Sequence, residues 1–429
     1  MMRARGWGRG GERVGGQQQE GDFVNTLMVI GASIGAAAVV ALAAGGAVWL
    51  GRRVVMPRPA KLVAITVNES GTRVTLPLTP TTRAPGEHGL WFDNGHARIG
   101  HVTTLDEAAG LVEREILLVT GGDLSMARHG RWSGHVYGRA EHADAHVEDI
   151  HIDTAHDRAP AWLFTAAEAS DTWAIHVHGI RSSRYSALRS VPIALELGMT
   201  ALVPSYYGDS DNPGNGTRPC YLGQREWRDV EAALDYAVAH GARRIVLFGW
   251  SMGGMISLLL SERSRHRDRI AGIVLISPAT HLRETLVRAA RNAGLPSAIA
   301  RRVPFALETW PLTRLCGLAE RIDFDELDWS CPGRLRVSTL ALHSDGDTDI
   351  PAALTRTFVE ANPGFATLAL LDPVPHQLEW NASPERFNAI VASWLQENAI
   401  TTTTRQGPPA TGSPRECTGS DDRMRQGER

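Results

Sequence analysis

The sequence is poor in the features that mark several common protein classes. Its cysteines, Cys220, Cys316, Cys331 and Cys417, are too few for a disulfide-stabilised scaffold, and their spacing matches no metal site. A bridge between Cys316 and Cys331 would suit an oxidising compartment, but we expect two unpaired buried thiols. Basic and acidic residues nearly balance, 44 against 47. This balance leaves no basic footprint for a polyanion, so we expect no nucleic-acid partner.

Charged side chains are missing from residues 23–50. This stretch is longer than the roughly 20 residues that cross a hydrocarbon core, so we predict a retained single-pass membrane anchor. The alternative is a cleaved signal peptide, whose apolar region usually spans about 7–15 residues. Arginines flank both ends of the stretch, so the positive-inside rule gives no orientation. We expect the main domain to be extracytoplasmic, and a chain that begins near Pro57 to be soluble and active.

Low-complexity ends enclose the part of the chain that we expect to fold. Residues 1–22 are rich in Arg and Gly, and residues 399–429 are rich in Thr, Pro and charged side chains. Neither segment has apolar periodicity, so both are predicted to be disordered.

Residues 57–157 contain short runs of β-branched residues that are separated by glycine and proline. The clearest of these runs are residues 62–67, 72–76, 116–120 and 146–152. They predict a small β-rich module in front of the main domain. The histidines of this module are scattered and do not predict a metal site: His129, His135, His142, His146, His151 and His156.

Residues 158–398 alternate between strand-like and helix-like segments. This alternation predicts an α/β domain with a mostly parallel, doubly wound sheet and crossover helices. Residues 279–333 interrupt the alternation with arginine-rich amphipathic segments. We expect this insertion to form a helical lid.

One short motif joins a strand to a helix inside this domain. An apolar run ends at Gly249, and a second apolar run begins at Met252, so that Gly249-Trp-Ser-Met-Gly253 matches G-x-S-x-G. This turn exposes the serine, here Ser251, to a neighbouring base, and points the Met252 N–H at a developing oxyanion. No Lys-Ser or Lys-Thr pair follows, so the turn is not a phosphate loop. An ordinary turn with an idle serine is the alternative.

The order of strands, helices and motifs over about residues 160–398 resembles that of the α/β-hydrolase fold. Within that superfamily, residues 226–230, 248–254 and 376–381 resemble the bacterial prolyl-oligopeptidase-like and serine-aminopeptidase-like branch. The resemblance implies a nucleophile, an acid and a base in the chain order Ser, Asp, His. Fold alone does not indicate the substrate.

The resemblance assigns the remaining site residues by position. It places the acid at Asp347, four residues after a strand-end histidine, His343, with Asp345 and Asp349 as alternatives. The base is His376, which lies between the last strand and the last helix. His343 itself is interpreted as a turn histidine outside the base position.

Two backbone N–H groups complete the expected site. The first is that of Met252 and the second, by the same resemblance, that of Ile180, with Arg181 as the alternative. His178, which ends the preceding strand, is interpreted as a second turn histidine.

These residues together predict a membrane-anchored serine hydrolase that needs no metal or cofactor. Its substrate would be an ester, thioester or short peptide, cleaved through an acyl-enzyme. The alternatives are a tethered binding or scaffold protein and an acyltransferase with the same triad. The lid arginines either form a solvated face or include one or two that reach the cleft and favour anionic substrates. The arginines in question are Arg283, Arg288, Arg291, Arg301, Arg302, Arg314 and Arg321.

Overall fold

The computed structural model describes residues 41–398 except 43, 94, 145, 156, 166–170 and 210–217. Both predicted disordered ends and most of the predicted anchor, residues 23–50, lie outside the described residues. Within the described part, no helix is both long enough and apolar enough to span a membrane.

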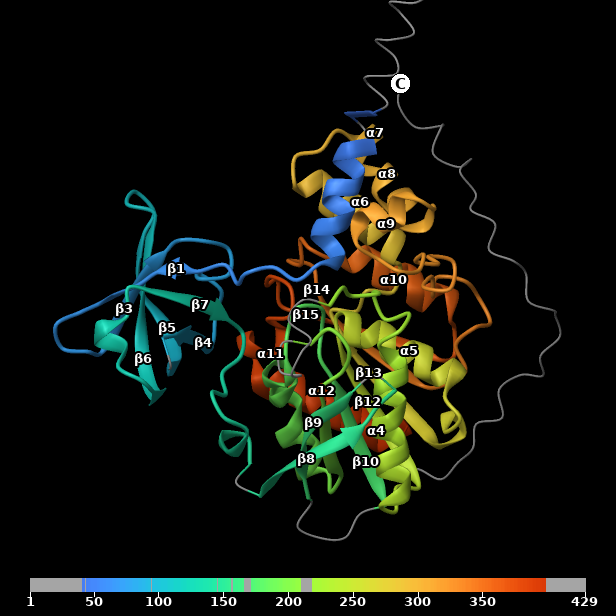
Figure 1. Ribbon diagram of the computed structural model, residues 1–429. Coiled ribbons are helices and arrows are strands. Elements are labelled where there is room, and N and C mark those ends of the chain that lie inside the picture. Colours follow the sequence, from blue (N-terminus) through green and yellow to red (C-terminus); the bar gives the residue numbers. More distant parts are fainter. Residues whose placement is uncertain are drawn as a thin grey trace, which may run out of the picture.

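The first sheet is the β-rich module, whose strands are all antiparallel (Figure 1). In the described part of the chain its strands, in the order β1-β7-β4-β5-β6-β3-β2, are β1 (Val63–Ala64), β2 (Thr66–Val67), β3 (Arg73–Pro77), β4 (His88–Phe92), β5 (Gly95–Asp106), β6 (Leu111–Gly121) and β7 (His129–Ser133). Only Ile65 separates β1 from β2, although they form opposite edges. The two edges therefore meet, and the sheet curls around a core that includes Ile65, Leu76, Leu90 and Ile99.

The second sheet organises the rest of the chain. Among the described residues its strands, in the order β15-β14-β13-β12-β10-β11-β9-β8, are β8 (Val147–Asp153), β9 (Arg158–Phe164), β10 (Thr172–Val177), β11 (Thr200–Pro204), β12 (Arg244–Trp250), β13 (Ile270–Ile276), β14 (Thr339–Ser344) and β15 (Ala366–Leu371). Strand β9 is antiparallel to both of its neighbours, and the other pairs are parallel.

The predicted boundary of the module at residue 157 was wrong. Strand β8 lies within the predicted module, but it pairs with β9 at the edge of the large sheet. Its side chains are exposed or partly exposed except Ile152, so the sequence of β8 does not set it apart from a strand of the module. Such a pattern identifies a strand with one wet face, but it does not say which sheet the strand joins.

Helices cover both faces of the large sheet, because the side chains of its central strand, β12, are apolar on both faces. Ile245 and Leu247 of β12 belong to one apolar cluster, whereas Val246, Phe248 and Trp250 belong to the other. The helices on the first face are α4 (Trp227–Ala239), α5 (Met252–Arg263) and α10 (Ala352–Ala361). Those on the second are α3 (Val191–Glu196), α11 (Glu379–Ala382) and α12 (Pro384–Asn398), with the short α2 (Arg184–Ala187) beside them.

The insertion between β13 and β14 is helical, as expected of the lid. Its helices in the described part are α6 (Leu282–Asn292), α7 (Ser297–Ala300), α8 (Arg302–Glu308) and α9 (Leu312–Cys316). Figure 1 shows a further helix, drawn in blue, which lies alongside them.

This blue helix runs through residues 44–55 and is part of the lid region. Its Ala47, Leu50 and Val55 are buried in the apolar cluster that contains the lid helices. At Gly51 an added Cβ would lie 3.0 Å from the Cys316 sulfur, so the helix packs closely. The last residues of the predicted anchor therefore contact the lid, and the lid is not made by residues 279–333 alone.

The cysteines differ in part from expectation. Cys316 is a free, buried thiol, and Cys220 is also free. The alternative bridge between Cys316 and Cys331 is therefore absent. Cys331 is disulfide-bonded, so the expectation of two unpaired thiols was wrong for Cys331.

Candidate active site

Ser251 lies at the sharp turn from β12 into α5. Its φ is +54°, in the left-handed region that non-glycine residues rarely adopt. The flanking glycines leave no room for a side chain. A Cβ at Gly249 would lie 2.6 Å from the Gly253 oxygen, and a Cβ at Gly253 would lie 2.1 Å from the Val177 oxygen. These positions require glycine, and the turn holds Ser251 in its strained conformation.

The structure brings Ser251, His376 and Asp347 together. The Ser251 Oγ lies 2.9 Å from His376 Nε2, and His376 Nδ1 lies 2.6 Å from Asp347 Oδ2. Because a carboxylate only accepts, Nδ1 carries the proton and Nε2 is left to accept from the serine hydroxyl. Asp347 Oδ1 accepts from the N–H groups of Asp349 and Ile350, each at 2.9 Å.

These three side chains follow the carboxyl ends of neighbouring parallel strands. Ser251 follows β12, Asp347 follows β14, and His376 follows β15. Since parallel strands end at the same edge of a sheet, residues far apart in the sequence meet there.

His343 contacts the acid directly, which the sequence analysis missed. Its Nε2 donates to the Ile350 oxygen at 2.9 Å and to Asp347 Oδ2 at 3.2 Å, while Nδ1 accepts from the Thr355 hydroxyl at 2.7 Å. The side chain is fully buried. A signal for this contact was present in the sequence, because His343 precedes Asp347 by four residues at the end of a strand. His343 is a positioning residue for the carboxylate.

Electrostatics favour the ionised acid and a basic imidazole. Burial opposes ionisation of Asp347, but hydrogen bonds from His343 and His376 outweigh it and hold its pKa well below the usual range. Burial likewise lowers the pKa of His376, but the hydrogen bond and charge of Asp347, with the charges of Glu379 and Asp349, raise it overall. A base with a raised pKa takes up the serine proton more readily.

The loop after β10 lies against Ser251. A Cβ at Gly179 would be 3.2 Å from the Ser251 Cβ. The Tyr206 hydroxyl donates to the His178 oxygen at 2.7 Å, and the buried His178 Nε2 lies 2.8 Å from Asp209 Oδ2. Tyr206 and Asp209 thus hold the loop that carries Ile180, one of the two expected N–H donors.

The other expected donor belongs to Met252, the first residue of α5. The first N–H groups of a helix have no partner within it, and the helix dipole favours negative charge there.

A cavity of about 160 Å³ adjoins this end of the site. Gly179 and Met252 line it, together with Val55, Arg58, Arg181 and Arg218. Among the described residues that line it there is no lid arginine, so the structure does not place the lid arginines at this cavity.

Val55 is held there because its oxygen accepts from the Cys220 N–H at 2.7 Å. The end of the helix at residues 44–55 is therefore a wall of the cavity, which the sequence analysis did not predict.

The β-rich module supports the loop that carries His376. The Nη1 of buried Arg189 donates to the Gln377 oxygen and to Asn381 Oδ1, both at 2.6 Å. The Asn381 amide donates in turn to the Glu87 oxygen at 2.7 Å and the Gly134 oxygen at 2.8 Å. The module is thus joined to the candidate site through Asn381 and Arg189.

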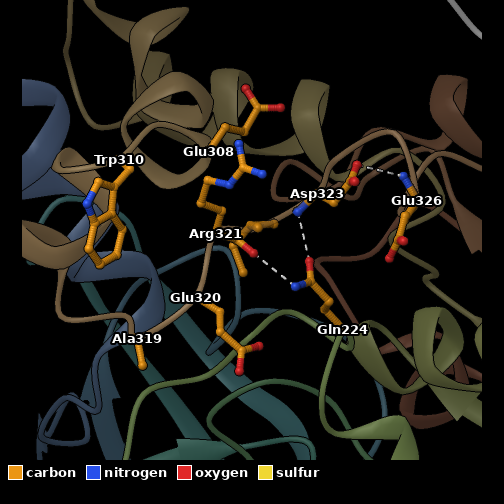
Figure 2. A pocket seen from close by; sticks show the side chains of 9 residues that line it. Gln224, Glu308, Trp310, Ala319, Glu320, Arg321, Asp323 and Glu326 are labelled. Atoms are coloured by element: carbon orange, nitrogen blue, oxygen red, sulfur yellow. Dashed lines mark hydrogen bonds between the residues drawn. The ribbon is translucent and has the colours of Figure 1, made fainter.

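A second hollow, of about 690 Å³, lies in the lid region (Figure 2). Figure 2 shows Gln224 bonded to the backbone of Arg321 and Asp323, at 2.9 and 2.7 Å. Of its acidic side chains, Glu308 is paired with Arg283 and Glu326 lies 3.2 Å from Arg263. None of the predicted site residues lines it among the residues described.

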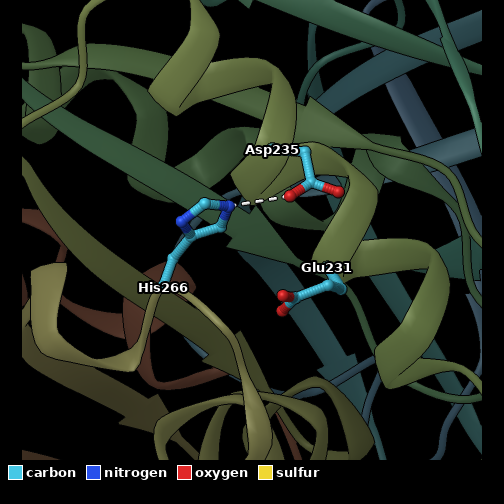
Figure 3. Close-up of side chains that lie close together, drawn as sticks. All are labelled: Glu231, Asp235 and His266. Carbon is cyan, nitrogen blue, oxygen red and sulfur yellow. Dashed lines mark hydrogen bonds and ion pairs between the residues drawn. The ribbon is translucent and has the colours of Figure 1, made fainter.

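One cluster in the described part of the chain has the composition of a metal site. Glu231 and Asp235 of α4 lie beside His266, as Figure 3 shows. Arg265 already supplies positive charge, with Nε 3.2 Å from Glu231 Oε1 and Nη2 2.9 Å from Asp235 Oδ2. We interpret the cluster as an ion-pair network between α4 and the end of α5.

Several solved structures are similar to part of this chain. The esterase Pf2001 of Pyrococcus furiosus is 20% identical, with 61% of this chain and 94% of that chain covered and a TM-score of 0.48. Est1E of Butyrivibrio proteoclasticus, with ferulic acid bound, is 18% identical, with 59% and 100% covered and a TM-score of 0.46. A thermophilic esterase of Thermogutta terrifontis is 19% identical, with 58% and 98% covered and a TM-score of 0.39.

Two family models match the two folded parts of the chain, whereas no curated protein matches it. Residues 63–133 match a model described as "Domain of unknown function (DUF8805)", and these residues contain β1 to β7. Residues 174–403 match the model of the "Alpha/beta hydrolase family". This match covers more than half of the chain and confirms the predicted fold class. The chain is a hydrolase and belongs to the alpha/beta hydrolase family.

Proposed function

We propose that the protein is a serine hydrolase that cleaves an ester, thioester or short peptide bond through an acyl-enzyme. Ser251 is the nucleophile, His376 the base and Asp347 the acid that orients the base. One observation carries the proposal: the continuous hydrogen-bond chain from Ser251 Oγ through both His376 nitrogens to Asp347. That chain has the geometry that an activated serine requires.

The reaction follows from the positions of these atoms. Ser251 Oγ attacks the substrate carbonyl while His376 Nε2 takes its proton, and the Met252 and Ile180 N–H groups stabilise the resulting oxyanion. His376 then gives the proton to the leaving group, and the acyl group remains on Ser251. A water molecule repeats the sequence in the second half, which releases the acid and restores the serine.

The finer resemblance to prolyl-oligopeptidase-like and serine-aminopeptidase-like enzymes keeps short peptides among the candidate substrates. A binding scaffold and an acyltransferase are the alternative functions. To separate these, purified protein is assayed with 4-nitrophenyl esters of graded chain length and with aminoacyl-nitroanilides, with and without an alcohol acceptor. Hydrolysis that depends on Ser251 supports the proposal. No turnover of any substrate favours the scaffold, and ester formation in the presence of the alcohol favours the transferase.

The raised pKa of His376 gives a testable pH dependence. Only neutral His376 accepts a proton from Ser251, so kcat/KM should fall as the pH drops through a midpoint above the ordinary 6.5. In Asp347→Asn the midpoint should move down, because burial then acts without the opposing carboxylate. The profile is measured between about pH 5 and 9 with a neutral ester. Asp345→Asn is the control, since Asp345 pairs with Arg356 at the surface. A wild-type midpoint below 6.5 contradicts the expectation.

We also propose that residues 23–50 attach the protein to a membrane, with the catalytic domain outside the cytoplasm. The absence of charge from this stretch supports attachment. Exposed apolar side chains on its described end and on the adjoining lid region support it as well, since such surfaces are typical of membrane contacts. They are Leu42, Trp49, Phe305, Trp310 and Leu315.

Full-length protein should therefore sediment with membranes and resist alkaline carbonate. A chain that begins at residue 41 should be soluble and active, because it keeps the helix at residues 44–55. A chain that begins near Pro57 lacks Val55 and the buried face of this helix, so the prediction that it is active is the one that this comparison tests. Carbonate extraction, and activity of the two shortened proteins, are the measurements. Full-length protein in the supernatant, or a natural N-terminus within residues 40–60, would refute the anchor.

A further inference from the structure

The cavity beside Gly179 and Met252 is lined by three arginines. Arg218 forms an ion pair with Asp157. Among the described residues, Arg58 donates only to a neutral backbone oxygen, that of Arg53. Arg181 has no side-chain hydrogen bond or ion pair to any described residue, although the charge of Asp349 acts on it. Two guanidinium groups at this cavity thus have no carboxylate bound to them within the described part of the chain.

Arg58 and Arg181 line the same cavity, and the positive charge of Arg181 acts on Arg58. Arg58 is largely exposed, but partial burial, followed by the positive charges of Arg181 and Arg53, lowers its pKa to about 10. The cavity offers little compensation, since Asp209 is the only carboxylate among its described lining residues. Asp209 is already committed to His178, at 2.8 Å. An anion that enters the cavity would therefore relieve this repulsion.

The arginines are also placed at the reacting end of the site. Arg181 directly follows Ile180 and is held at a φ of +54°, so its position is linked to that of the oxyanion loop. Met252, the other proposed oxyanion donor, lines the same cavity. A substrate that places a group in this cavity therefore needs only a short carbon chain between that group and the reacting carbonyl. The volume of about 160 Å³ has room for a few carbon atoms and a carboxylate, and is too small for a long acyl chain.

We propose that the preferred substrates are esters of short dicarboxylic acids, and that Arg58 and Arg181 bind their free carboxylate. The inference rests on the proposed hydrolase function. A guanidinium group presents paired N–H donors that match the two oxygens of a carboxylate. The selectivity comes from Arg58 and Arg181, which both precede residues 279–333 in the sequence, and not from the lid arginines.

The test compares two esters of similar length, mono-4-nitrophenyl glutarate and 4-nitrophenyl hexanoate, after subtraction of spontaneous hydrolysis. In the wild type kcat/KM should be higher for the glutarate ester. Arg58→Gln and Arg181→Gln should each lower the glutarate-to-hexanoate ratio by about tenfold, the loss expected for one charge-assisted contact near solvent. Arg288→Gln, an exposed lid arginine, is the control and should leave the ratio unchanged. Added salt should reduce the wild-type preference, because it screens the guanidinium charges.

A binding measurement separates recognition from catalysis. Free glutarate should bind to the Ser251→Ala protein in calorimetry, and about tenfold more weakly when Arg181→Gln is added. If the hexanoate ester is hydrolysed through Ser251 but the glutarate ester is not preferred, or the ratio is unaffected in both arginine variants, the inference fails and the hydrolase function stands. If Ser251 supports hydrolysis of neither ester, both proposals fail.

Discussion

Replacing Ser251 with alanine should lower turnover by about six orders of magnitude, the loss seen when the nucleophile of a serine triad is removed. Among the described residues, the Ser251 hydroxyl forms a hydrogen bond with His376 Nε2 and with no other group. Without this hydroxyl, the acyl group of the substrate has no oxygen atom to which it can be transferred. Removing the oxygen leaves the base and the oxyanion donors intact, but they are left without a covalent intermediate to stabilise.

The Ser251→Ala protein should fold normally. The turn is fixed by backbone contacts, including the Ser251 N–H bond to the Ile276 oxygen at 2.8 Å, and alanine retains them. The measurements are kcat with a short 4-nitrophenyl ester and the thermal unfolding midpoint. Activity above a few per cent of wild type in a folded Ser251→Ala protein would refute the assignment of the nucleophile.

Replacing Asp347 with asparagine should cost about four orders of magnitude in turnover. The amide NH₂ group cannot accept from His376 Nδ1–H, so the imidazole is favoured in the wrong tautomer. His343 adds to the effect, because its Nε2–H, 3.2 Å from Asp347 Oδ2, would then face either an amide oxygen or an N–H donor. Steady-state turnover of the folded variant, checked by circular dichroism, is the measurement.

Asp345→Asn and Asp349→Asn are the matched controls in the same loop. The Asp345 carboxylate pairs with Arg356 at 2.9 Å, away from the acid position. Asp349 contributes its backbone N–H to Asp347, which the amide substitution keeps. Each should therefore cost far less than Asp347→Asn. If Asp349→Asn is the crippling change, the acid has been assigned two residues too early.

The main domain could be predicted because its strands are apolar on both faces. Runs such as Ile270–Ile276 are buried almost throughout, and a strand that is buried on both faces can be recognised without its neighbours. The turn at Ser251 was predictable for a similar reason. Its glycines are required by close contacts with residues nearby in the chain and with one adjoining strand. The sequence order of Ser251, Asp347 and His376 then followed from the family resemblance.

What could not be predicted depends on contacts between distant segments. The uncharged stretch that ends at Leu50 has the same hydropathy whether it faces lipid or the lid, and Ala47 and Leu50 in fact pack on the lid. Arg58 and Arg181 meet at one cavity although more than a hundred residues separate them in the chain. The bond between His343 and Thr355 of α10 also joins two separate elements, whereas the contact of His343 with Asp347 could have been inferred from their four-residue spacing.

The central claim, that Ser251 is an activated nucleophile, is tested most directly by covalent labelling. The wild-type protein is treated with a fluorophosphonate probe, and the modified peptide is identified by mass spectrometry, with the folded Ser251→Ala and His376→Ala proteins as controls. We expect rapid modification of Ser251 alone, loss of labelling in both variants, and a labelling rate that rises as His376 loses its proton. An unmodified Ser251 in folded wild-type protein, or equal labelling without His376, would contradict the account.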